Sequence, residues 1–263
     1  MTETLLDDVW IRRYHDGPGT HGPAGSATLV CFPHAGGSAS YFSTLSGLLR
    51  SSHRVLALQY PGRQDRLRER CLSTIDELAD EAFSALEPLM GGPVALFGHS
   101  MGAMIAFEVA TRMKRRRGLD PAALFVSGRR APSRDRHDDE IVHLGGDSAL
   151  VAEMKRLSGT DARVLDDPEV VEMILPALRS DYRAVETYRY RPGPRLGCPT
   201  IALTGDDDPK ASADEVDAWR DHTSGEFRMH VFPGGHFYLK EHWPAVADVI
   251  AGQLGRARPD QSR

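Results

Sequence analysis

Short apolar segments alternate with segments of helical periodicity along most of the chain. Six segments are predicted to be strands, at residues 27–32, 55–58, 94–97, 124–128, 200–204 and 227–232. Helices are predicted between them, at residues 39–49, after Ser73 as the expected N-cap, and at 101–116, 212–221 and 240–255. Residues 9–14 suit an edge strand. Apolar strands joined by helices are typical of a mostly parallel sheet covered on both faces, so we expect an α/β fold.

The alternation stops between the fourth and fifth apolar strands. Residues 131–194 contain no convincing strand, only helical segments at 148–158, 168–175 and 176–188 with prolines between them. A helical insertion between two strands of a parallel sheet predicts a lid over the carboxyl ends of the strands, where open α/β sheets place their sites. We therefore expect one domain over residues 1–263 with a helical lid at about 131–194.

Composition narrows the class of protein. The chain has 263 residues, 41% hydrophobic, which can bury a sizeable core, and a net charge of -5 argues against nucleic acid as a partner. Acidic residues near the start without an apolar run behind them argue against a signal peptide, and no stretch approaches the roughly 18 apolar residues of a membrane span. Three cysteines at unrelated spacings suit reduced thiols and lack metal-ligand spacing. We expect a cytoplasmic monomer without metal or cofactor.

The segment Gly98-His99-Ser100-Met101-Gly102 fits the G-x-S-x-G pattern of a nucleophile elbow. An apolar strand precedes it and good helix formers follow it, as this turn requires. The pattern also occurs by chance in loops, but this context favours the elbow. Glycines on both sides of the serine are expected because side chains there would collide with neighbouring backbone. The sequence therefore predicts Ser100 as a nucleophile.

A serine nucleophile needs a base and an acid, which in this fold follow it along the chain. His236, in Gly234-Gly235-His236-Phe237 after the last strand, is the predicted base, in preference to His34 and His99, which flank the site. The loop after residues 200–204 offers Asp206, Asp207 and Asp208. Chemistry alone leaves the acid open; we choose Asp208 because the third residue past the glycine should reach the histidine.

An acyl-transfer mechanism also needs hydrogen-bond donors for the oxyanion. One expected donor is the backbone N–H of Met101, at the start of the helix after the elbow. The other lies in the loop after the first apolar strand, where Gly36 and Gly37 allow backbone to approach a substrate. Ala35 is the candidate there, although the loop could be an ordinary strand-to-helix turn.

Five ordered motifs resemble those of type II thioesterases, the stand-alone editing hydrolases of polyketide synthases and nonribosomal peptide synthetases. The resemblance covers about residues 10–250. Its motifs are Phe32-Pro33-His34-Ala35-Gly36-Gly37-Ser38, Tyr60-Pro61-Gly62-Arg63, Gly98-His99-Ser100-Met101-Gly102, Leu175-Pro176-Ala177-Leu178-Arg179-Ser180-Asp181 and Gly234-Gly235-His236-Phe237.

The resemblance implies an α/β-hydrolase fold and hydrolysis of acyl thioesters carried on the phosphopantetheine of acyl or peptidyl carrier proteins, through an acyl-serine intermediate. It also implies Ser100, Asp208 and His236 as the triad. The extra acids in Gly205-Asp206-Asp207-Asp208 depart from commoner versions of the family's G-x-x-D. The alternatives are a general carboxylesterase or lipase acting on free small esters, and a non-catalytic partner of a synthase.

Two groups of residues bear on how such a substrate would bind. About two-thirds of the apolar lid residues are expected to pack on the core and the rest to line an acyl chamber; they are Leu150, Met154, Leu157, Val164, Met173, Ile174, Leu178 and Val185. Carrier proteins are usually acidic, which makes basic residues near the channel mouth candidates for docking, although any one could simply be solvated. These are Arg63, Arg66, Arg68, Arg70, Arg129, Arg130 and Arg134.

Overall fold

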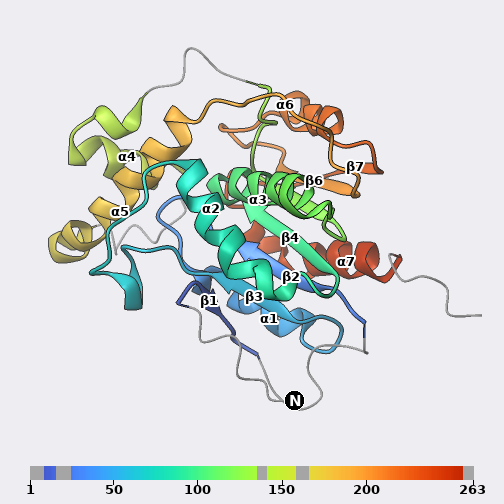
Figure 1. Ribbon diagram of the computed structural model, residues 1–263. Helices are drawn as coiled ribbons and strands as arrows, with labels where there is room; N and C mark the ends of the chain where they lie inside the picture. The colour runs from blue at the N-terminus through green and yellow to red at the C-terminus, as the bar shows by residue number, and fades with distance from the viewer. Residues whose placement is uncertain (1–8, 16–24, 135–140, 158–165, 257–263) are drawn as a thin grey trace, which may run out of the picture.

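The computed structural model describes residues 9–15, 25–134, 141–157 and 166–256 (Figure 1). A sheet of seven strands runs through the molecule in the order β1-β3-β2-β4-β5-β6-β7, and every neighbouring pair is parallel except β1 with β3. The strands are β1 Ile11–Arg12, β2 Thr28–Phe32, β3 Val55–Leu58, β4 Val94–His99, β5 Leu124–Ser127, β6 Thr200–Gly205 and β7 Phe227–Phe232. The predicted α/β-hydrolase fold is confirmed.

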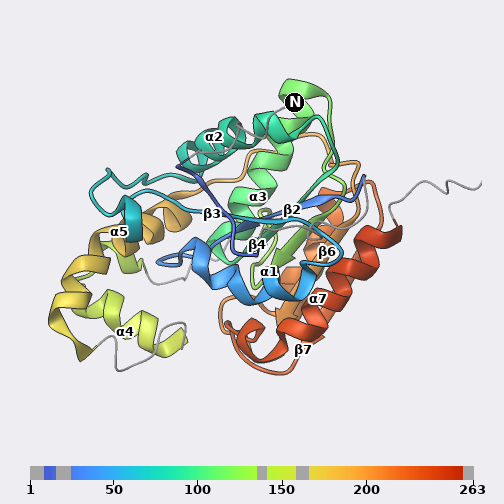
Figure 2. The same cartoon turned by 90° about the horizontal axis from the view of Figure 1, so that it is seen from below.

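Helices cover both faces of this sheet. In Figure 2, α2 and α3 lie on one side of the strands, whereas α1 and α7 lie on the other. The helices are α1 Ser43–Leu49, α2 Ile75–Leu86, α3 Met101–Arg112, α4 Asp147–Leu157, α5 Pro168–Thr187, α6 Ala213–Asp217 and α7 Leu239–Arg256. Because successive strand residues face opposite sides, Val30 and Phe32 join the core under α2 and α3, while Leu29 and Cys31 join the core under α1 and α7.

The predicted N-cap of α2 was wrong, and the helix predicted at 101–116 changes type along its length. The N-cap of α2 is Thr74, whose side chain accepts a hydrogen bond from the backbone N–H of Glu77. Ser73 instead donates its N–H to the Glu77 carboxylate at 3.2 Å. The helix predicted at 101–116 is α-helical only to Arg112 and continues as a π turn to Arg117, before Gly118 in the left-handed conformation.

The helical segment predicted to break at Pro176 is one continuous helix, α5. A proline inside a helix removes one backbone hydrogen bond and crowds the preceding turn. The residues after Pro176 compensate because the side chains of Ala177, Leu178 and Ala184 are buried. Leu178 also forms a small separate core with Val142 and Leu150. Helices α4 and α5 lie together to one side of the sheet in both views (Figures 1 and 2).

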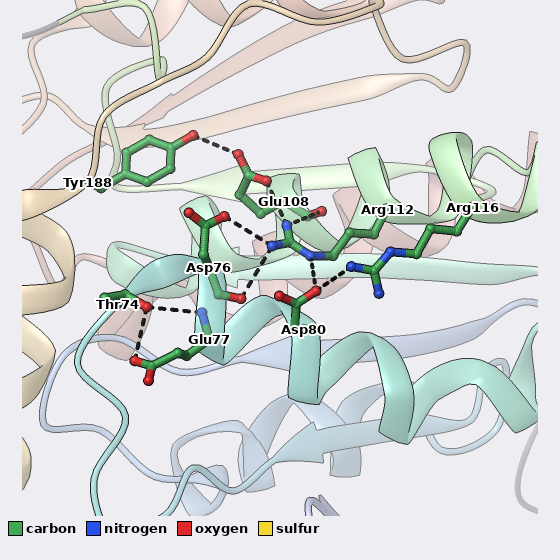
Figure 3. A network of polar contacts seen from close by, with 8 residues as sticks. All are labelled: Thr74, Asp76, Glu77, Asp80, Glu108, Arg112, Arg116 and Tyr188. Carbon is green, nitrogen blue, oxygen red and sulfur yellow. Dashed lines mark hydrogen bonds and ion pairs between the residues drawn. The ribbon is translucent and has the colours of Figure 1, made fainter.

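A network of charged groups joins α2 to α3 (Figure 3). Arg112 of α3 donates to Asp76 at 3.0 Å, to Asp80 at 2.9 Å and, within its own helix, to Glu108 at 2.7 Å. Tyr188, which follows α5, donates its hydroxyl to Glu108 at 2.8 Å. The network therefore links two core helices to the segment that returns from α5 to the sheet.

Candidate active site

Ser100 sits at the turn between β4 and α3. It has φ 55° and ψ -115°, a strained conformation for a residue with a side chain. Neighbouring backbone leaves no room for side chains on either side. A Cβ at Gly98 would lie 2.1 Å from the carbonyl oxygen of Gly102, and one at Gly102 would lie 1.9 Å from that of Phe32. The segment therefore has the geometry of a nucleophile elbow.

Three residues from separate loops are connected through the imidazole of His236. Its Nε2 lies 2.9 Å from Ser100 Oγ, and its Nδ1 lies 2.9 and 3.0 Å from the two carboxylate oxygens of Asp208. Both the imidazole and the carboxylate are buried, at 3% and 0% side-chain exposure. In this arrangement the imidazole can take a proton from the serine while the carboxylate fixes its orientation.

The three neighbouring aspartates of the acid loop have different environments. Asp208 accepts a hydrogen bond from the N–H of Lys210 at 2.8 Å in addition to its contact with His236. Asp206 accepts the N–H of Gly234 at 2.8 Å and so ties the acid loop to the histidine loop. The side chain of Asp207 is exposed. Of the three, only Asp208 touches the imidazole.

The two predicted oxyanion donors lie near the serine. Ala35 and Ser100 line the same cavity, and Met101 is the first residue of α3, where the helix dipole is positive. No hydrogen bond among the described residues uses the N–H of Ala35 or Met101. Neither N–H is therefore committed to an acceptor within the described part of the protein. Gly36, next to Ala35, has φ +73°, which suits glycine.

Two further histidines surround the site without reaching the serine. Burial lowers the pKa of His34 to about 3 and that of His99 well below its usual value. Both rings are therefore neutral near pH 7. His99 Nδ1 pairs with Ser127 Oγ at 3.0 Å, and Ser127 pairs with the Tyr238 hydroxyl at 2.7 Å. Sequence reasoning missed Ser127 and Tyr238, because no motif contains this pair.

A cavity of about 410 Å³ opens beside Ser100 and His236. Its apolar lining includes Met104 of α3, Leu157 of α4 and Val185 of α5. Its basic lining residues are Arg129, Arg130, Arg134, Arg189 and Lys210. The volume falls in the range of small-molecule sites, and the mixed lining suits a ligand with an apolar end and an anionic end.

The apolar lid residues fall into a group that lines the cavity and a group that packs in the core of the lid region. Leu157 and Val185 line the cavity, whereas Leu150, Met154 and Leu178 belong to the small core of the lid region. Met173 is 46% exposed. The predicted lining residue Val164 lies outside the described residues.

Three of the arginines considered for docking, Arg63, Arg66 and Arg130, are buried, although Arg130 lines the cavity. Arg63 is buried against Asp181, and Arg66 is buried against Trp10, where it pairs with Glu69 at 2.6 Å. The place of Arg63 and Arg66 in that prediction was wrong, because each serves an internal contact. Arg68 and Arg70 are exposed. Within the described ranges, no group of three or more histidine, cysteine or acidic residues could hold a metal ion, and no helix is long and apolar enough to cross a membrane.

A parallel sheet covered on both faces, with a serine on a strained elbow hydrogen-bonded to a histidine and through it to an aspartate, defines an α/β-hydrolase. The thioesterase domain model matches residues 27–254, so the chain belongs to the thioesterase family. Among its relatives is thioesterase PikA5 of Streptomyces venezuelae, 50% identical over 99% of this chain and 92% of the relative.

Solved structures agree with this assignment. The type II thioesterase BorB from the borrelidin biosynthetic cluster has a TM-score of 0.85 and 51% identity, covering 94% of this chain and 98% of BorB. RedJ, a thioesterase of the prodiginine pathway in Streptomyces coelicolor, has a TM-score of 0.81 and 38% identity, covering 96% of each chain. The chain is a hydrolase that acts on thioesters, of the type II group.

Proposed function

We propose that this thioesterase removes acyl groups from the phosphopantetheine arm of acyl or peptidyl carrier proteins in polyketide or nonribosomal peptide synthesis. The observation that carries the proposal is the hydrogen-bonded chain from Ser100 through His236 to Asp208 at the wall of a partly apolar, basic-lined cavity. BorB comes from the borrelidin biosynthetic cluster and RedJ from the prodiginine biosynthetic pathway. A cytoplasmic location and a monomeric state remain predictions.

The proposed reaction has two halves. His236 Nε2 takes the proton of Ser100 as Oγ attacks the thioester carbonyl, and Asp208 stabilises the resulting imidazolium. The N–H groups of Ala35 and Met101 bind the oxyanion of the tetrahedral intermediate. His236 then protonates the departing thiolate, which leaves an acyl-serine. A water molecule, deprotonated by the same imidazole, attacks that ester; the imidazolium then returns the proton to Ser100 Oγ as the bond from Oγ to the acyl carbon breaks and the carboxylic acid leaves.

The cavity suits such a substrate at both ends. The apolar side chains of Met104, Leu157 and Val185 can surround the acyl group near the serine. The cationic side chain of Arg134 can attract the phosphodiester of the arm and the acidic surface of the carrier. A general esterase would need no such charge around its cavity.

The test compares one acyl group on three carriers: a holo carrier protein, a free pantetheine thioester and a simple alcohol ester. Intact-protein mass spectrometry follows deacylation of the carrier, and product acid is measured for the other two. We expect kcat/KM to be highest on the carrier protein and to be lost in Ser100→Ala. Equal or faster release from the alcohol ester would support a general esterase, and an unchanged rate in Ser100→Ala would refute the serine mechanism.

A further inference from the structure

Two of the five sequence motifs supply neither a member of the chain of Ser100, His236 and Asp208 nor a predicted oxyanion donor. They are the segment ending at Arg63, after β3, and the segment ending at Asp181, in α5. The structure brings these two end residues together. Arg63 donates two hydrogen bonds to the Asp181 carboxylate, at 2.7 and 3.0 Å. Their side chains are 8% and 0% exposed, so this ion pair is buried.

The buried pair holds the loop that carries Ala35. Asp181 Oδ2 accepts the backbone N–H of Gly36 at 2.8 Å, and Arg63 Nη1 donates to the carbonyl oxygen of Gly37 at 3.1 Å. The carbonyl of Ala35 and the N–H of Gly36 belong to one planar peptide group. Fixing the N–H of Gly36 therefore also fixes the carbonyl of Ala35 and limits backbone rotation at Ala35. Leu178, one turn before Asp181 in α5, packs closely on Gly36. A Cβ added to Gly36 would lie 2.8 Å from Leu178 Cδ1.

The loop after β3 supports the same segment at other points. Gln59 accepts the backbone N–H of Ala39 at 2.9 Å and donates to the carbonyl oxygen of Arg63 at 3.2 Å. A buried ion pair is a poor source of stability, because desolvation offsets much of the attraction between the charges. Its value here lies in orientation, since one carboxylate joins α5, the loop after β3 and the loop after β2.

We propose that Asp181, neutralised by Arg63, is a positioning residue for the oxyanion site: its carboxylate holds Gly36 so that the N–H of Ala35 faces the reacting carbonyl. The proposal rests on the proposed function, because it assumes that Ala35 binds an oxyanion during thioester hydrolysis. It makes α5 part of the catalytic framework as well as of the lid region.

Two double variants isolate the contact with Gly36. Both replace Arg63 by methionine, which removes the buried charge. Asp181→Asn/Arg63→Met retains an oxygen that can accept the Gly36 N–H, whereas Asp181→Leu/Arg63→Met does not. Apolar replacement of a buried ion pair is often tolerated by the fold. The two variants differ in the acceptor for Gly36, so comparing them separates orientation from the loss of the ion pair itself.

We expect the leucine variant to have a kcat about 10–100-fold below that of the asparagine variant, with KM changed little, because an oxyanion donor acts in the transition state. Its affinity for an alkylboronic acid, which forms a tetrahedral adduct on the serine, should fall by a similar factor. Thermal unfolding of both variants serves as the control for folding. Equal kcat and equal boronate affinity in two folded variants would overturn the proposal.

A second measurement needs no variant. In the intact enzyme, the Gly36 amide should exchange with solvent hydrogen far more slowly than an exposed loop amide, because Asp181 sequesters it. Exchange at the rate of an unprotected amide would also overturn the proposal. Failure of the proposed function would be distinct, since the wild-type enzyme would then lack Ser100-dependent thioesterase activity whatever the state of Gly36.

Discussion

The three consecutive aspartates of the acid loop provide a sharp test of the site. Both carboxylate oxygens of Asp208 lie within 3.0 Å of His236 Nδ1, and the side chain is fully buried. In Asp208→Asn the amide NH₂ can face Nδ1, which favours the tautomer with the proton on Nε2. That tautomer cannot accept the proton of Ser100. We expect kcat to fall about 10³–10⁴-fold, or roughly 4–5.5 kcal/mol of transition-state stabilisation.

The neighbouring residues supply matched controls. Asp207→Asn changes an exposed side chain and should leave kcat within about twofold of wild type. Asp206→Ala removes the acceptor for the Gly234 N–H and should cost about 0.5–1.5 kcal/mol of stability, with a smaller loss of kcat than Asp208→Asn. Steady-state thioester hydrolysis and denaturant unfolding measure the two effects. A loss in Asp207→Asn equal to or greater than that in Asp208→Asn would refute the assignment of the acid.

Three further predictions concern folding. Gly102→Ala should give no folded enzyme in a soluble-expression assay, because its Cβ would lie 1.9 Å from a backbone oxygen, whereas Gly252→Ala, with open space in α7, should unfold at an equal or higher temperature. Burial lowers the pKa of His34 from 6.5 to about 3, so as the pH falls the unfolded state takes up a proton at this residue before the folded state does. The free energy of unfolding in urea should therefore fall between pH 6.5 and about 3, by up to about 1.4 kcal/mol per pH unit from this residue; an equally steep slope in His34→Gln would contradict this. Arg112→Ala should cost about 1–2 kcal/mol of unfolding free energy, and Arg117→Ala, which removes an exposed pair with Glu87, less than about 0.5; equal costs would argue against the network of Figure 3.

The local pattern of apolar and polar residues was sufficient to predict the strands of the sheet and the order of strands and helices along the chain. The apolar strands, the elbow at Ser100 and the loop containing His236 all leave signals within a few residues, because backbone geometry at those points restricts the residue type. The buried residues of α2, from Ile75 to Leu86, follow the helical period in the same way. These features depend on short-range sterics and on the period of each element.

Interactions between distant segments could not be predicted in this way. Pro176 indicated a helix end, but the packing of Ala177 and Leu178 outweighs the local cost. Arg63 and Arg66 were predicted to be surface cations because a sequence does not show which arginine a distant segment buries, as Asp181 does for Arg63 and Trp10 for Arg66. The partner of Arg63 is 118 residues away, and no local pattern connects the two.

The attachment of α5 to the loop after β2 has a mechanical consequence. A movement that lifted this helix off the body of the protein would pull the Asp181 carboxylate away from Gly36. It would also separate Asp181 from Arg63 and leave each charge without its partner. With α5 displaced, the enzyme would admit substrate but hydrolyse it poorly. The oxyanion site would then be assembled only while α5 is packed against the body of the protein.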